Sequence, residues 1–178
     1  MSKLRKVSEA TLKSVKAGHS GLFTTNDLAL LIGIEVDSNF AKYLHKAVKV
    51  GVLEKVCTNV FINPLAPPEG KGILVKIANI IHWDKLVYIS LESQLSYLGE
   101  ISQVMMDRLT VMTTGRSGVI KTKYGTIEFT HTSRKIESIK DEIYFDPDIG
   151  AFRATKEKAV KDLKRVGRNI SMIETIDE

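Results

Sequence analysis

One stretch constrains this chain more than any other: residues 23–64, FTTNDLALLIGIEVDSNFAKYLHKAVKVGVLEKVCTNVFINP. Its cap and turn signals divide it into two short helices, a tight turn between them, and a β-hairpin that ends at a proline. This order of elements is typical of a winged helix-turn-helix, in which the second helix enters the major groove of DNA.

The first helix has both ends marked. Thr24 can accept a hydrogen bond from a free backbone N–H, and Asp27, three residues later, fits the capping-box pattern. Leu28 and Ile32 repeat at helical spacing. Gly33 is expected to end the helix because glycine adopts positive φ at little cost.

The second helix, capped by Asp37 or Ser38, has two different faces. Its apolar side chains follow an i, i+4, i+7, i+8 spacing and are expected to pack on the first helix: Phe40, Leu44, Ala47 and Val48. The opposite face carries three cations, an amide and a phenol, without a carboxylate: Asn39, Lys42, Tyr43, Lys46 and Lys49. Such a face suits phosphates and base edges, although a lysine face is also typical of a solvated helix.

Two short strands, 53–56 and 60–62, are predicted to form the wing, with a turn at 57–59 in which asparagine can take the left-handed conformation. Lys55, Thr58 and Asn59 are expected to contact DNA beside the recognition helix, and Thr24 and Thr25 complete the predicted DNA-contact set. The alternative is an ordinary hairpin that only covers the core of the domain.

Charge is distributed unevenly along the 178 residues. The net charge is +5, and residues 1–63 hold nine Lys and Arg against five Asp and Glu. Basic surfaces attract polyanions through counterion release, but they also keep proteins in solution.

Cys57 is the one cysteine of the sequence, so neither a disulfide nor a cysteine zinc site is expected. With no apolar leader and no long apolar segment, we expect a cytoplasmic protein without a membrane span.

The proline cluster at 64–68 indicates a boundary between a domain at 1–66 and a domain at 67–178. Beyond it, the pattern predicts helices at 73–81 and 91–98, a strand at 86–89, and later strands at 109–113, 119–122, 126–131, 143–145 and 151–154, before a last helix capped by Thr155. The expected fold class is α+β: a winged helix-turn-helix followed by a mixed α/β domain with a small antiparallel sheet.

Catalytic signals are weak. No glycine-rich phosphate loop, nucleophile elbow or histidine pair with metal-ligand spacing occurs in the sequence. Four carboxylates cluster near one strand and could hold Mg²⁺, although the same residues also form a turn signal: Asp141, Glu142, Asp146 and Asp148. We therefore expect no enzyme activity, no cofactor and no metal.

The last helix is strongly basic. Helical spacing places most of its cations on the outer face, where they could form a surface for a protein partner or nucleic acid, with simple solvation as the alternative: Lys156, Lys158, Lys161, Lys164, Arg165 and Arg168.

Four segments in this order resemble the AbiEi family, the antitoxin regulators of type IV toxin–antitoxin and phage abortive-infection operons: VYISLESQLSYLG at 87–99, LTVMTTGRSG at 109–118, YGTIEFTHT at 124–132 and ATKEKAVKDLKR at 154–165. The resemblance spans nearly the whole chain, although this chain is shorter than many members and its last helix is less apolar. It implies an N-terminal domain that binds repeats in its own promoter DNA and represses the operon. It also implies a C-terminal antitoxin domain that neutralises a nucleotidyltransferase-like toxin, by direct contact or by a functional effect.

Two alternatives stay open. The winged fold could serve as a protein-interaction module, or the chain could be a generic transcriptional regulator without antitoxin activity.

Overall fold

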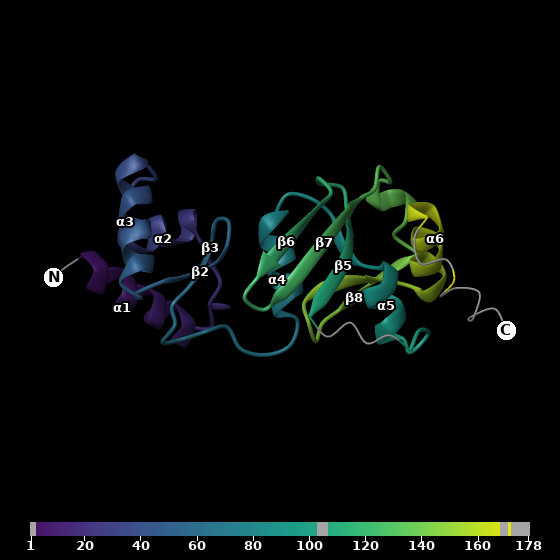
Figure 1. Ribbon diagram of the computed structural model, residues 1–178, viewed down its shortest axis with the longest axis horizontal. Helices are drawn as coiled ribbons and strands as arrows, with labels where there is room; N and C mark the ends of the chain where they lie inside the picture. The colour runs from purple at the N-terminus through teal and green to yellow at the C-terminus, as the bar shows by residue number, and fades with distance from the viewer. Residues whose placement is uncertain (1–2, 103–106, 168–170, 172–178) are drawn as a thin grey trace. The chain divides into compact units, whose positions relative to one another are not determined.

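The computed structural model describes residues 3–102, 107–167 and 171. The chain divides into two compact units, Met1–Ile73 and Leu74–Glu178 (Figure 1). Its described residues form an α+β fold with six α-helices and two sheets.

The described residues of the N-terminal unit form three helices and one small sheet. The helices are α1 (Lys3–Lys16), α2 (Thr25–Ile32) and α3 (Ser38–Lys49), and the strands are β1 (Phe23–Thr24), β2 (Glu54–Cys57) and β3 (Val60–Ile62). Both strand pairings are antiparallel, in the order β1-β3-β2. The hairpin was predicted, whereas β1, a two-residue strand that precedes α2, was not.

Both predicted ends of α2 and the predicted start of α3 are confirmed. The Thr24 hydroxyl accepts from the backbone N–H of Asp27 at 3.1 Å, and the Asp27 carboxylate accepts from the N–H of Thr24 at 2.7 Å. Gly33 follows α2 in the left-handed conformation. Asp37 caps α3 by accepting from the N–H of Phe40 at 2.7 Å. These local bonds satisfy backbone donors that a helix leaves free, so they set where each helix begins.

One apolar cluster holds the N-terminal unit together. Phe40, Leu44 and Ala47 of α3 pack with residues of α1, α2 and the sheet, and each is at most 4 % exposed. Because these three residues share one face of α3, the opposite face of the helix is turned to solvent.

The C-terminal unit contains α4 (Ile73–Ile81), α5 (Leu91–Tyr97) and α6 (Lys156–Val166), with α4 beginning at the boundary between the units. Its strands are β4 (Val87–Ile89), β5 (Arg108–Thr113), β6 (Gly118–Thr122), β7 (Gly125–His131), β8 (Ile143–Asp146) and β9 (Ala151–Ala154). The short 3-10 helix η1 (Ile136–Ser138) lies between β7 and β8.

The expectation of a small antiparallel sheet in this unit is wrong. The sheet has six strands in the order β6-β7-β5-β4-β9-β8, and the pairs β5–β7 and β4–β9 are parallel. A parallel pair needs a long connection between its strands, so it cannot be read from adjacent strands and turns alone. The strand segments themselves were predicted within one or two residues.

Helices α5 and α6 cover one face of this sheet. Tyr88 and Met112, which are paired across β4 and β5, pack with residues of α5 and α6. Side chains of successive strand residues point to opposite faces, so Val111 and its partner Phe129 face the other side. The ring of His82, just beyond α4, packs against Phe129 there with ring centroids 4.6 Å apart. None of the helices in the described part of the chain is both long and apolar enough to cross a membrane.

Candidate nucleic-acid interface

The outer face of α3 presents four of the five contact residues predicted on this helix to solvent. Asn39, Lys42, Lys46 and Lys49 are all exposed. The inner face of the same helix is fixed in the core by Phe40, which is 2 % exposed. The amide of Asn39 lies 3.4 Å from the carboxylate of Asp37, the α3 cap, so one acidic group borders this basic face at its N-terminal end.

Tyr43 has a structural contact that the sequence did not indicate. Its hydroxyl donates to the backbone carbonyl of Lys3 at 2.7 Å, and the half-buried ring lies 5.8 Å from the ring of Phe40. Burial raises the pKa of the hydroxyl, so it keeps its proton and remains a donor. In this structure Tyr43 joins α3 to the start of α1, and its hydroxyl is engaged within the unit.

The hairpin residues divide into free and engaged side chains. Lys55 and Thr58 are exposed. Asn59 takes the left-handed conformation, with φ of 62°, and its side-chain oxygen accepts from the backbone N–H of Thr25 at 3.1 Å. The hairpin turn is therefore tied to the start of α2, where the Thr24 side chain is occupied by the capping box.

A cavity of about 240 Å³ lies where α2, α3 and the hairpin meet. His45 lines it together with Thr25 of α2 and Lys55 of β2. On α3, Ala41, His45 and Val48 follow an i, i+4, i+7 spacing that forms one strip beside the lysine face. His45 was missed because a lone histidine carries no motif. One turn after Ala41, His45 lines the same cavity as Lys55 of the hairpin.

The prediction that Lys158 lies on the exposed basic face of the last helix is wrong. Its side chain is 1 % exposed, and the ammonium group forms an ion pair with Asp162, one turn later on α6. Tyr88 and Ser90 also donate to the Asp162 carboxylate, at 3.1 and 2.8 Å. Ser90 is the N-cap residue of α5 but makes no side-chain cap bond, because its hydroxyl donates to Asp162.

The other predicted residues of α6 are distributed differently. The ammonium of Lys156 lies 2.7 Å from Glu100, and that of Lys161 lies 2.6 Å from Glu142. Lys164 and Arg165 are exposed. Arg168 lies outside the described residues. The outer face of α6 is therefore less basic than the sequence indicated, because two of its lysines are paired with carboxylates from elsewhere in the unit.

Two of the four acidic residues considered for metal binding, Glu142 and Asp146, are engaged in other contacts. Asp146 accepts from Arg153 at 2.6 Å and Glu142 from Lys161 at 2.6 Å, and these bonds hold the pKa of both carboxyl groups below the ordinary range. No group of three His, Cys, Asp or Glu side chains that could hold a metal ion occurs among the described residues.

Comparisons with known proteins identify a fold relative only. No protein-family model matches the chain, and no curated protein matches it significantly in sequence. Among solved structures, the fold is similar to that of the RV2827C protein from Mycobacterium tuberculosis, with a TM-score of 0.58 and 10 % sequence identity. The match covers 86 % of this chain and 58 % of the other, so this chain spans little more than half the length of that relative.

Proposed function

We propose that the N-terminal unit is a winged helix-turn-helix that binds double-stranded promoter DNA, with α3 in the major groove and the β2–β3 hairpin beside it. Lys42, Lys46 and Lys49 contact phosphates, and Asn39 reads base edges. Lys55, Thr58 and His45 extend the contact along the hairpin side. Tyr43 and Asn59 act by holding α3 and the hairpin in place.

The observation that carries this proposal is the exposure of one face of α3. Three lysines on one face point away from a core that buries the other face of the same helix. A helix held in this way presents its polar face as a rigid surface, which suits insertion into a groove. The element order α1-β1-α2-α3-β2-β3 supports the same assignment.

We propose further that the chain is an antitoxin of a type IV toxin–antitoxin system that represses its own operon. The support is the AbiEi-like order of the segments at 87–99, 109–118, 124–132 and 154–165. In this proposal the C-terminal unit is no enzyme, and it neutralises a nucleotidyltransferase-like toxin encoded in the same operon.

DNA binding is tested by the salt dependence of promoter affinity. The logarithm of the DNA association constant falls linearly with the logarithm of the salt concentration, and each phosphate contact removed makes this fall shallower by about 0.9 units of slope. The Lys42→Ala/Lys46→Ala variant should therefore bind less tightly and lose roughly two units of slope. Lys13→Ala/Lys16→Ala is the matched control, since it removes two exposed lysines of the same unit from α1. If the α3 variant binds like the wild type at every salt concentration, α3 does not contact the DNA.

Antitoxin activity is tested separately in cells that express the toxin. The full-length Lys42→Ala/Lys46→Ala variant should restore growth as well as the wild type does, while it no longer represses the promoter. Toxicity that neither protein relieves would remove the antitoxin proposal and leave a regulator.

A second candidate is a protein-docking role for the N-terminal unit. It is favoured by exposed apolar side chains near α3, since Leu30 is 84 % and Val36 55 % exposed. This candidate predicts no promoter binding at physiological salt but a stable complex with the toxin that Leu30→Gln weakens.

A further inference from the structure

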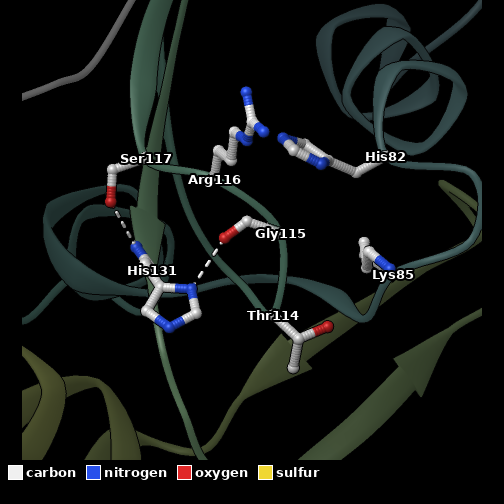
Figure 2. A pocket seen from close by; sticks show the side chains of 7 residues that line it. All are labelled: His82, Lys85, Thr114, Gly115, Arg116, Ser117 and His131. Atoms are coloured by element: carbon white, nitrogen blue, oxygen red, sulfur yellow. Dashed lines mark hydrogen bonds between the residues drawn. The ribbon is translucent and has the colours of Figure 1, made fainter.

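The C-terminal unit contains a cavity of about 520 Å³ that the proposed DNA-binding surface does not use (Figure 2). Four nitrogen-bearing side chains line it: His82, Lys85, Arg116 and His131. The loop 114–117, which connects β5 to β6, forms the rest of the lining. A volume of this size falls in the range of small-molecule sites, roughly 300–1,000 Å³.

The sheet topology brings these residues together. Strands β5 and β7 are parallel and paired from Arg108–Thr126 to Thr113–His131, so their carboxyl ends lie at the same edge of the sheet. The loop that follows β5 and the last residue of β7 both line the cavity. Ligands of open sheets with parallel strands commonly bind beyond the carboxyl ends of the strands. The position of the cavity in the fold is therefore one that favours a binding site.

Contacts on two sides hold the loop in place. The backbone N–H of His131 donates to the Ser117 hydroxyl at 2.8 Å, and the imidazole Nδ1 of His131 lies 2.7 Å from the carbonyl oxygen of Gly115. Because a carbonyl oxygen only accepts, Nδ1 carries the proton and Nε2 is left for another partner. The loop is also anchored by the N–H of Gly115, which donates to Thr113 Oγ1 at 3.0 Å.

Gly115 allows the imidazole of His82 to lie directly against the loop. A Cβ at residue 115 would come within 2.2 Å of His82 Nδ1 and 2.5 Å of its Cε1. The imidazole cannot simply retreat, since its ring already packs against Phe129. Figure 2 shows the Arg116 side chain and the His82 ring pointing toward one another above Gly115. Glycine at this position therefore keeps a second imidazole beside the guanidinium.

The charge of the lining favours an anion. None of the described residues that line the cavity is a carboxylate. The ammonium of Lys85 lies 2.9 Å from the carboxylate of Asp84, which balances its charge. The guanidinium of Arg116 has no hydrogen-bond or ion-pair partner within the described part of the chain. A guanidinium presents a fork of donors that matches two phosphate oxygens. The hydroxyls of Thr114 and Ser117 accept backbone N–H groups, and their protons remain available for anion oxygens.

We propose that this cavity binds a phosphorylated small molecule of nucleotide size, with its phosphate held by Arg116, Lys85 and the 114–117 loop. A lone phosphate would fill a small part of the volume, so the remainder of the ligand occupies the rest of the cavity, which His82 and His131 also line. This site is independent of the DNA-binding proposal.

The test is a titration of the full-length protein, followed by the backbone amide signals of residues 114–118. The probes are a mononucleotide, inorganic phosphate and the unphosphorylated nucleoside. The mononucleotide should shift these signals and bind at least tenfold more tightly than either of the other two. Arg116→Gln should weaken nucleotide binding at least tenfold, and Gly115→Ala should weaken it by displacing His82.

Arg165→Gln is the matched control, because it removes the same charge from an exposed position on α6 in the same unit. It should leave nucleotide affinity unchanged within twofold, and Arg116→Gln should leave promoter binding unchanged. Equal weakening by the two arginine variants would overturn the site in favour of general electrostatic attraction. Unperturbed 114–118 signals at millimolar nucleotide, or equal affinity for phosphate and nucleotide, would also overturn it.

Discussion

Lys158 and Asp162, one turn apart on α6, form an ion pair whose two side chains are 1 % and 0 % exposed. The Lys158 ammonium also donates to the Tyr88 hydroxyl at 3.0 Å, and Tyr88 donates to Asp162. Burial, followed by the Asp162 carboxylate, raises the pKa of Tyr88, so this hydroxyl stays protonated as a donor. The network connects α6 to β4 through the interior of the C-terminal unit.

Breaking one side of this pair should destabilise the protein strongly. Lys158→Met leaves a buried carboxylate without its cation, at a cost of about 3–5 kcal/mol. In Lys158→Met/Asp162→Asn no uncompensated charge remains, and the amide can still accept from Tyr88 and Ser90. The double variant should therefore be less destabilised than the two single variants added together, by at least about 1 kcal/mol. Urea denaturation gives the free energy of unfolding of the wild type, Lys158→Met, Asp162→Asn and the double variant. If the losses of the two single variants add up to the loss of the double variant, the two charges do not interact.

This pair also shows why part of the structure could not be predicted. Helical spacing places Lys158 and Asp162 on one strip, but an i, i+4 pair of opposite charge is usual on exposed helix faces. Only the hydroxyls of Tyr88 and Ser90, about seventy residues earlier in the chain, make an interior position tolerable for these charges. Local patterns cannot report such distant partners.

The N-terminal unit was predicted more closely because its determinants are local. The capping box of α2, the Asp37 cap of α3 and the left-handed Asn59 each depend on residues within a few positions. The lysines of the predicted contact face are exposed on α3, as the helical spacing predicts. The spacing did not indicate the positions of His45 and Tyr43, because both depend on which other element lies beside α3.

Tyr43→Phe should separate a positioning role from base contact. The variant loses the hydrogen bond to the Lys3 carbonyl but keeps the ring, so unfolding free energy should fall by about 1 kcal/mol. Promoter affinity at a temperature where both proteins are folded should change less than threefold, and sequence preference should not change. A lost preference for one base pair would instead make Tyr43 a direct reader of DNA.

Stability should depend on pH through His82. Burial, the largest effect, lowers the pKa of this imidazole; Asp84 opposes the shift and Lys85 adds to it. The unfolded chain therefore binds more protons near the ordinary histidine pKa, about 6.5, so stability is full above that value and is lost as pH falls below it.

Denaturation at pH 7.5 and 5.5 tests this dependence. The wild type should lose more stability between the two values than His82→Gln does. The other charged or titratable groups around the cavity, Lys85, Arg116 and His131, are present in both proteins and cancel in the comparison. Equal losses in the two proteins would mean that His82 titrates alike in the folded and unfolded chain.

Asn59 should control the position of the hairpin through two separable effects. Asn59→Gly keeps the left-handed conformation and loses the bond to the Thr25 N–H, which should cost about 1 kcal/mol. Asn59→Ala loses the same bond and also places a Cβ in the left-handed region, which adds about 1–2 kcal/mol. Denaturant midpoints should therefore fall in the order wild type, Asn59→Gly, Asn59→Ala.

In the DNA-binding proposal, both variants should weaken promoter binding even at temperatures where they are folded, because Lys55 and Thr58 lose their fixed position relative to α3. Wild-type affinity in a folded Asn59→Gly variant would show that the hairpin bond to α2 has no part in DNA binding.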